Sequence, residues 1–213
     1  MIFGIVLANG IGSRFGTHLP KQFQTINGKK VLDYSIDSLL QSKYVDNIVV
    51  VIDDKYRDMV PESKSIACIP GGNTRNSSLK KALNYIHDYY SCDKLIIVEA
   101  ARPMIRSDII DHYIMELDRY DAVITGQHIT DSLGSYGRHY VNRDDYYLIQ
   151  APEAFRFDLL YDNFNENSPI TATNQQLPVD SKISINFDFK ENYKLTYPED
   201  LQMIESQMRA RNV

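Results

Sequence analysis

The segment LANGIGSRFGTHLPKQF, residues 7–23, joins glycines to cations and is the first part of the chain whose residue types could do chemistry. Arg14 lies inside it, and Lys21 follows in the triplet Pro-Lys-Gln. Two cations beside a glycine loop suit a triphosphate, whose charge must be neutralised while a bond breaks. Glycines also let a backbone turn its amides toward anionic oxygens at close range; those in the segment are Gly10, Gly12 and Gly16.

Two well-known glycine loops do not fit this segment. Phe15 stands where the dinucleotide fingerprint G-x-G-x-x-G needs a glycine, and no Gly-Lys-Ser/Thr follows as a Walker A loop requires. A nicotinamide oxidoreductase is the alternative enzyme, since Asp53 and Asp54 end a predicted strand where a ribose-binding acid could lie. No Tyr-Lys or His arrangement for hydride transfer accompanies them. An ordinary turn with solvated basic residues is the plain alternative, and Pro20-Lys21-Gln22 argues against it.

The segment GGNTRNSSLKKAL, residues 71–83, places two glycines before a predicted helix start. A helix N-terminus carries free amides and partial positive charge, which suit a phosphate or the polar edge of a base. Arg75 could reach a phosphate. A helix cap without any ligand is the alternative, and the segment by itself favours that alternative.

The segment VEAARP, residues 98–103, ends an apolar run on the carboxylate of Glu99. Such a tip could be a metal site, a substrate site or a strand ending in a turn. Two further cations, Arg143 in VNRDD and Lys194 in NYKLTYPEDL, are surface charges when each is taken singly. Their meaning depends on what the fold brings together.

The elements that would position these segments alternate between strands and helices. Apolar runs predict strands at 2–8, 47–53, 66–72, 94–100 and 121–127. Helical spacing of apolar residues predicts helices at 31–42, 73–90 and 107–117, the last with Ser107 as its N-cap. This alternation predicts an α/β fold with a doubly wound, mostly parallel sheet. Ligands of such sheets bind at the carboxyl ends of the strands, where the three segments lie.

The alternation breaks down in the last third of the chain. Residues 128–150 are polar and rich in tyrosine, which predicts a hairpin or arm leaving the core. A helix is predicted at 155–164, and short strands are predicted at 183–187 and 193–198. A closing helix is predicted at 198–210, with a proline in its first turn.

Composition limits the class of protein. The chain has 213 residues with 43% hydrophobic content and a mean hydropathy of −0.35, which predicts a single globular domain over residues 1–213. There is no apolar run of about 20 residues and no signal-peptide pattern at the N-terminus, so we expect a cytoplasmic protein with no membrane partner. Cys68 and Cys92 fit no metal-ligand spacing and are expected to be reduced thiols.

The net charge of −5 argues against nucleic acid as a partner. It also sets a condition on a polyphosphate ligand, because the field of the whole protein would repel it. A local cluster of lysine and arginine must then override the global charge.

Taken together, five segments resemble the 2-C-methyl-D-erythritol 4-phosphate cytidylyltransferase family, which includes ribitol-5-phosphate cytidylyltransferases. They are LANGIGSRFGTHLPKQF, GGNTRNSSLKKAL, VEAARP, QAPEAFRFDLL and NYKLTYPEDL, in that order. The resemblance implies a Rossmann-like nucleotidyltransferase domain whose protruding β-arm, residues 128–150, builds a homodimer. It also implies a reaction of CTP with a phosphorylated polyol or sugar, giving a CDP-polyol and pyrophosphate, with Mg²⁺ as the cofactor.

The resemblance further implies roles for single residues. Arg14 and Lys21 would be the catalytic cations at the α-phosphate and the departing pyrophosphate. The nucleotide-binding positions would be Ala8, Asn9, Gly10, Gly12, Gly72, Asn73, Arg75, Ser78 and Ala100. The positions binding the second substrate would be Arg102, Asp131, Ser132, Arg143 and Lys194. Arg143, being in the arm, would reach across the dimer.

The chain also departs from the family pattern. The family reads His-Asp-Ala-Ala/Val-Arg-Pro, and Ala100 is taken to stand where its Mg²⁺-contacting aspartate would be. Glu99 would then hold the metal from one position earlier, or the triphosphate and water would hold it, or only nucleotide binding would survive. Asn9 replaces a small residue, while Asn174 and Asp180 replace Asp and Glu. These changes favour a CDP-polyol for surface polysaccharide over isoprenoid synthesis, which stays the alternative.

Overall fold

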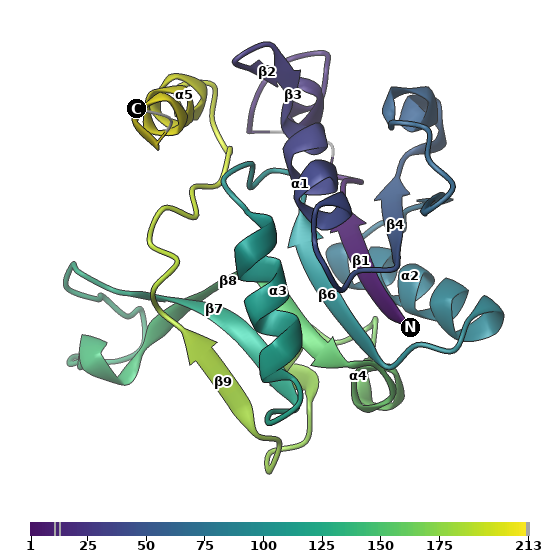
Figure 1. The fold of residues 1–213 in the computed structure, drawn as a ribbon. Helices are drawn as coiled ribbons and strands as arrows, with labels where there is room; N and C mark the ends of the chain where they lie inside the picture. Colours follow the sequence, from purple (N-terminus) through teal and green to yellow (C-terminus); the bar gives the residue numbers. More distant parts are fainter. Residues whose placement is uncertain (11, 13, 212–213) are drawn as a thin grey trace.

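The computed structural model describes residues 1–10, 12 and 14–211. Within that part of the chain, seven strands form one sheet in the order β5-β4-β1-β6-β8-β7-β9 (Figure 1). They are β1 (Ile2–Leu7), β4 (Asn47–Ile52), β5 (Ile66–Pro70), β6 (Lys94–Glu99), β7 (Ala122–His128), β8 (Tyr147–Arg156) and β9 (Ile183–Asn186). A separate antiparallel pair consists of β2 (Thr25–Ile26) and β3 (Lys29–Lys30).

The central strands run parallel, so their carboxyl ends meet at one edge. β1 pairs in parallel with both β4 and β6, and β4 pairs in parallel with β5. The register sets Leu7 of β1 beside Val51 of β4 and Glu99 of β6. The segments after β1 and β6 therefore leave the sheet side by side, and the segment after β5 leaves the same edge on the far side of β4.

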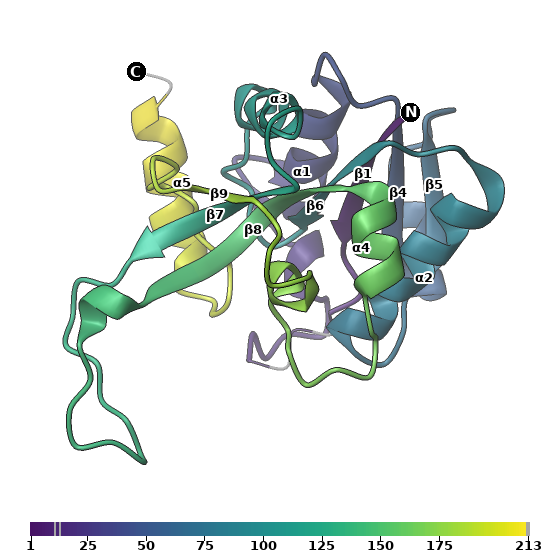
Figure 2. The same ribbon diagram turned by 90° about the horizontal axis from the view of Figure 1, so that it is seen from below.

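Helices cover both faces of the sheet (Figures 1 and 2). α1 (Val31–Leu40) and α3 (Ser107–Glu116) pack on one face, and α2 (Arg75–Tyr89) and α4 (Phe157–Asn163) pack on the other. Both sides of the central strands are thus buried, which explains why those strands read as continuous apolar runs. The doubly wound α/β fold is confirmed. Among the described residues, no helix has the length and apolar character to cross a membrane.

β8 is the strand of the seven-stranded sheet that the sequence did not predict. It lies between β6 and β7 and is antiparallel to both. Ala154 and Phe155 are fully buried in it, yet Gln150, Pro152 and Glu153 interrupt its apolar pattern. The predicted helix at 155–164 was wrong at its start, because β8 continues to Arg156 and α4 follows.

Three smaller predictions were also wrong. The N-cap of α3 is Arg106, whose guanidinium pairs with Asp108 at 2.9 Å, and Ser107 is the first helical residue. Residues 193–198 are irregular and form no strand. α5 (Asp200–Arg211) begins two residues after Pro198, because the Asp200 carboxylate accepts hydrogen bonds from the amides of Thr196 and Tyr197 at 2.7 and 2.8 Å.

The predicted arm protrudes from the body of the molecule. β7 and β8 extend past the sheet, and the loop between them, residues 129–146, stands away from the domain (Figure 2). Tyr136 and Tyr140 in this loop are exposed. The Arg143 guanidinium donates a hydrogen bond to the Thr130 carbonyl across the loop.

Candidate active site

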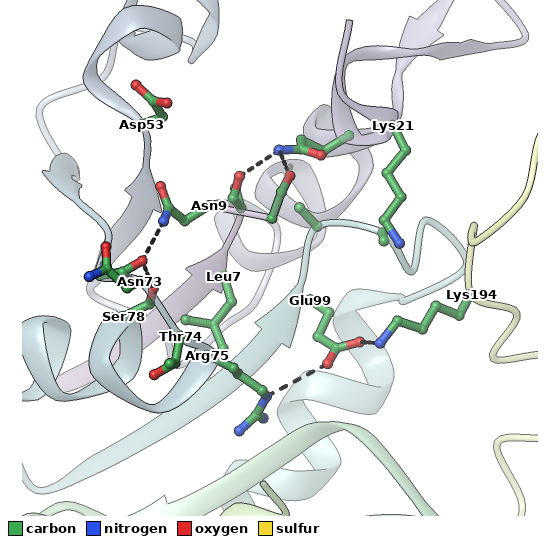
Figure 3. Close-up of a pocket in the computed structure, with 16 residues that line it drawn as sticks. Leu7, Asn9, Lys21, Asp53, Asn73, Thr74, Arg75, Ser78, Glu99 and Lys194 are labelled. Atoms are coloured by element: carbon green, nitrogen blue, oxygen red, sulfur yellow. Dashed lines mark hydrogen bonds and ion pairs between the residues drawn. The ribbon is translucent and has the colours of Figure 1, made fainter. Parts of the chain in front are cut away.

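A cavity of about 550 Å³ opens at the carboxyl ends of β1, β5 and β6 (Figure 3). It brings together most of the predicted nucleotide-site residues with one cation predicted to be catalytic and one lysine predicted to bind the second substrate. The predicted site residues lining it are Ala8, Asn9, Gly10, Lys21, Gly72, Asn73, Arg75, Ser78, Glu99, Ala100 and Lys194. Segments more than 170 residues apart in the chain thus share one wall.

A buried glutamine holds the backbone at the start of the glycine loop. Gln22 is 4% exposed, and its amide donates to the carbonyls of Ala8 at 2.6 Å and Gly10 at 3.0 Å. Gly12 has a φ of +65°, a left-handed conformation that favours glycine. Phe15 is buried, which gives the residue that breaks the dinucleotide fingerprint a packing role. Gln22 was not predicted as a site residue, although the Pro-Lys-Gln triplet signalled it.

Asn9 connects the glycine loop to the loop that follows β5. Its side-chain amide donates to the Gly72 carbonyl at 2.9 Å (Figure 3). Gly71 has to be glycine here, because an added Cβ would lie 2.1 Å from Asn9 Cγ. Ser78 Oγ accepts a hydrogen bond from the Gly72 amide at 3.0 Å. This end of the cavity is built mainly from amides, carbonyls and hydroxyls, and the Asp53 carboxylate that also lines it is neutralised by Lys55 at 3.0 Å.

The start of α2 is a closed helix cap. Thr74 Oγ1 accepts from the Ser77 amide at 3.0 Å, and Ser77 Oγ accepts from the Thr74 amide at 2.9 Å. This reciprocal arrangement satisfies two amides that a helix start leaves open. A helix cap is thus present at the start of α2, and Thr74 of that cap also lines the cavity.

The other end of the cavity is charged and centres on Glu99 (Figure 3). Its Oε2 lies 2.7 Å from Lys194 Nζ and 3.3 Å from Arg102 Nε. Its Oε1 lies 3.8 Å from Arg75 Nε. Burial by itself would raise the pKa of Glu99, but Lys194, Arg102 and Arg75 outweigh burial and hold that pKa at about 2. Glu99 is therefore ionised and surrounded by cations.

Lys21 adds a further cation to this end. Burial lowers its pKa, the neighbouring charge of Lys194 lowers it further, and Glu99 acts in the opposite sense. Arg14 is exposed, with its guanidinium 5.9 Å from the centre of the Tyr197 ring, and its charge also lowers the pKa of Lys21. The local cation cluster required to override the net charge of −5 is present.

Several predicted residues lie outside the described wall of the cavity. Arg102 is 8% exposed and supports Glu99 from behind, donating also to the Asn192 carbonyl at 2.6 Å. Asp131, Ser132 and Arg143 are exposed in the arm. Gly12 and Arg14 belong to the glycine loop without being among the described lining residues. The catalytic role of Arg14, the nucleotide-binding role of Gly12 and the substrate-binding roles of the others remain predictions.

The placement of the family aspartate at Ala100 was wrong by one position. In His-Asp-Ala-Ala-Arg-Pro the aspartate precedes the arginine by three residues, as Glu99 precedes Arg102. Ala100 is 1% exposed and packs in the apolar core, while its amide donates to the Leu7 carbonyl at 3.1 Å. The acid at the tip of β6 is thus retained as a glutamate, which weakens the case for a chain that only binds nucleotide.

The donor set fits Mg²⁺ as an ion shared with bound phosphates. No group of three or more His, Cys, Asp or Glu within the described ranges could hold a metal. Mg²⁺ commonly takes one or two carboxylates and completes its shell with phosphate and water. Glu99 could supply such an oxygen only by giving up contacts with the cations that already face its two carboxylate oxygens, Lys194, Arg102 and Arg75. Asp53 also lines the cavity, but its carboxylate accepts from the Lys55 amide at 3.1 Å and pairs with Lys55 Nζ at 3.0 Å.

A buried acid behind the wall was not predicted. Glu153 on β8 is 2% exposed, and its Oε1 lies 3.1 Å from Arg75 Nη2. The two residues are 78 positions apart in sequence. Only the pairing of β8 with β6 and β7 brings them together, so no local pattern could have indicated the contact.

Comparisons with known proteins agree with this geometry. A family model described as 2-C-methyl-D-erythritol 4-phosphate cytidylyltransferase matches residues 2–210. The chain is 30% identical to the protein of that name from Caldicellulosiruptor saccharolyticus, over 93% of each chain. It is 31% identical to a bifunctional ribulose 5-phosphate reductase/CDP-ribitol pyrophosphorylase of Haemophilus influenzae, covering 98% of this chain and 48% of that relative. The chain thus spans about half the length of the Haemophilus protein.

Solved structures give the same answer for the fold. A 2-C-methyl-D-erythritol 4-phosphate cytidylyltransferase from Francisella tularensis superimposes with a TM-score of 0.80 at 26% identity, covering 97% of this chain and 99% of that one. A 4-diphosphocytidyl-2C-methyl-D-erythritol synthase from Anaerococcus prevotii superimposes with a TM-score of 0.81 at 23% identity, covering 98% and 96%. At the lower identity the likeness concerns the fold.

Proposed function

We propose, from the premise that the chain belongs to the 2-C-methyl-D-erythritol 4-phosphate cytidylyltransferase family, that it joins CTP to a polyol phosphate and releases pyrophosphate. The observation that carries this proposal is the two-ended cavity. One end is neutral and suits a nucleoside, and the other gathers Lys21, Lys194 and Glu99 beside a glycine loop.

The proposed reaction is a direct displacement at phosphorus. An oxygen of the acceptor phosphate forms a bond to the α-phosphorus of CTP. The bond from that phosphorus to the bridging oxygen breaks, and pyrophosphate leaves with the electron pair. The attacking oxygen is already anionic, so no base has to remove a proton from it. The described residues lining the cavity include no histidine, in keeping with a reaction that needs no general base.

Catalysis would then consist of positioning and charge stabilisation. Lys21 is half-buried beside the glycine loop, where a desolvated cation interacts strongly with developing negative charge. Arg14 would join it from the exposed side of the loop. Lys194, at the charged end, would bind the phosphate of the acceptor. When bound, Mg²⁺ would shield the phosphate oxygens, and Glu99 is the residue that would help to hold it.

The neutral end would hold the cytidine. The Asn9 amide and the Ser78 hydroxyl fix the backbone around Gly72, so that carbonyls and amides are already in position when a base arrives. A preorganised wall of this kind costs little ordering on binding. Selection of cytosine over other bases would therefore depend on the backbone of the glycine loop and of the loop that follows β5.

Methylerythritol 4-phosphate is the first candidate acceptor, supported by the family model and by the Caldicellulosiruptor relative. Ribitol 5-phosphate is the second, supported by the name of the Haemophilus relative. A role in surface polysaccharide synthesis would follow only from a ribitol- or glycerol-type acceptor. Asn174, one of the departures favouring such an acceptor, is 6% exposed and is not among the described residues lining the cavity, which weakens that argument.

The arm supports a proposal of its own. Residues 128–150 would pair with a second copy, and Arg143, Asp131 and Ser132 would then enter the partner's cavity. What supports this is their exposure together with the protruding shape of the arm (Figure 2).

The test is pyrophosphate release by the purified protein with CTP and Mg²⁺. The acceptors are methylerythritol 4-phosphate, ribitol 5-phosphate and the glycerol phosphates, each also assayed with UTP, ATP and GTP in place of CTP. We expect CTP-dependent turnover, highest with methylerythritol 4-phosphate. CTP binding without turnover on any acceptor would contradict the proposal and favour a nucleotide-binding homologue.

A further inference from the structure

Glu153 is a buried carboxylate that the proposed reaction does not use. It lies on β8, outside the described wall of the cavity, and is 2% exposed. Its Oε1 accepts hydrogen bonds from Arg75 at 3.1 Å and from Thr173 Oγ1 at 3.3 Å. Its Oε2 is buried and has no hydrogen-bond partner within the described residues. An acid placed so deeply is costly unless its charge is compensated.

The compensation comes from Arg75, whose guanidinium is held on three sides. Nη1 donates to the Thr171 carbonyl at 2.9 Å and to Thr173 Oγ1 at 3.0 Å, and Nη2 donates to Glu153. Nε points to Glu99 Oε1 at 3.8 Å (Figure 3). Arg75 was expected among the nucleotide-binding residues, but its guanidinium nitrogens are engaged by protein groups and span two acids, one behind the wall and one in the cavity.

The two ends of this span differ in strength. The contact with Glu153 is a hydrogen-bonded ion pair at 3.1 Å, whereas the contact with Glu99 at 3.8 Å is longer than a hydrogen bond. The orientation of the guanidinium is therefore set from behind. Its position in turn acts on Glu99, which also faces Lys194 at 2.7 Å.

We propose that Glu153 is a positioning residue, which orients Arg75 and through it the Glu99–Lys194 pair at the acceptor end of the cavity. The inference rests on the proposed function, because the acceptor phosphate is what Lys194 would bind. Glu153 touches no substrate in this account and acts through Arg75. Loss of its charge should therefore affect the acceptor more than CTP.

The charge on Glu153 responds to pH in a definite direction. Burial raises its pKa, and Arg75 of α2 acts in the opposite sense. The other charged groups facing it are Glu99 of β6, which raises the pKa further, and Arg102 just beyond β6. A carboxyl with a raised pKa gains its proton at a higher pH than an ordinary glutamate does. The ion pair between Glu153 and Arg75 should therefore weaken at that higher pH.

The experiment compares wild type with Glu153→Gln, which keeps the shape and removes the charge. We expect kcat/KM for the acceptor to fall about ten- to hundredfold, as expected for misplacement of a positioning group, while KM for CTP stays near wild type. As the pH falls and Glu153 gains its proton, kcat/KM of wild type for the acceptor should fall. The variant carries no such proton at position 153 and should not show that fall. Asp111→Asn is the matched control, since Asp111 of α3 is also a buried acid, 8% exposed, but accepts its hydrogen bond from Ser42 Oγ at 2.6 Å, away from the cavity.

Two further comparisons exclude a purely structural effect. Adding Glu153→Gln to Arg75→Ala should cause no further loss if Glu153 acts through Arg75. The ¹⁵N–¹H resonance of Arg75 Nε should shift in Glu153→Gln and stay in place in Asp111→Asn. Unchanged acceptor kinetics in a folded variant, additive losses in the double variant, or an unmoved resonance would each overturn the proposal. The resonance needs no turnover, so it tests Glu153 even if wild type proves inactive and the proposed function fails.

Discussion

Arg102 beside the cavity and Arg143 in the arm are both paired with an acid close in sequence, yet their surroundings differ. Arg102 Nε lies 3.3 Å from Glu99 Oε2, and the two side chains are 10% and 17% exposed. Arg143 Nε lies 3.6 Å from Asp144 Oδ1, and those side chains are 47% and 82% exposed. Water screens the second pair and leaves it weak, whereas burial makes the first pair costly to break.

This difference in burial indicates which residues of the proposed site are already held in position within one chain. The charges of the cavity fix one another and leave little freedom of position. The charges of the arm are solvated and can form new contacts without first breaking strong ones. The cavity would therefore be organised before substrate arrives, and the arm would become part of a site only against another surface.

The largest expected effect is on stability, from Glu99→Gln. The change leaves Lys194, Arg102 and Arg75 without their shared acid, which should lower the free energy of unfolding by about 3–5 kcal/mol. Asp144→Asn is the matched control in the arm and should cost about 0–1 kcal/mol. Urea denaturation measures both. Equal losses of unfolding free energy in the two variants would contradict the difference in strength between the cavity pair and the arm pair.

Lys21→Ala should act on turnover instead of stability. Removing a half-buried cation from the charged end of the cavity should lower kcat about 100- to 1,000-fold, by analogy with loss of one oxyanion-hole donor. Lys29→Ala is the control, because Lys29 pairs with Asp37 beside β3 and away from the cavity. Pyrophosphate release is the measurement. Full turnover by Lys21→Ala would contradict the assignment of the cavity as the active site.

The pH dependence of stability should show the charge of Glu99. Its pKa is lowered to about 2 from 4.5, so the folded state holds the ionised form and gains about 3 kcal/mol from it. That gain is complete above the unfolded pKa and disappears as the pH falls from about 4.5 to about 2. Urea unfolding at a series of pH values should show the loss in wild type. In Glu99→Gln that part of the slope should be missing, and its persistence would exclude Glu99 as the source.

Sequence patterns predicted the parts of this molecule that depend on local chemistry. The strands buried on both faces and the glycine loop are continuous in sequence, and the structure contains both. The connections between distant residues were not predictable in this way. Lys194 meets Glu99 only because the chain returns to the edge of the sheet, and Glu153 meets Arg75 only because β8 inserts beside β6.

β8 was missed for a related reason. Its burial comes from packing between two neighbours, while Gln150, Pro152 and Glu153 give it no apolar period to recognise. The two polar side chains among them are used within the fold. Gln150 accepts from Asn192 at 2.9 Å, and Glu153 holds Arg75. Polar residues with long-range partners thus conceal a strand from any local pattern.

The proposal that the arm of one subunit completes the cavity of its partner is tested most directly by complementation between two inactive variants. Lys21→Ala disables the cavity and Arg143→Ala disables the arm, so each variant on its own should be nearly inactive. A mixed dimer, isolated with two different affinity tags, would contain one site that pairs an intact cavity with an intact arm. We predict that pyrophosphate release returns in the mixed dimer, to about half the wild-type level expected for one working site in two. A mixed dimer that forms and stays inactive, or an Arg143→Ala variant with full activity, would contradict the account.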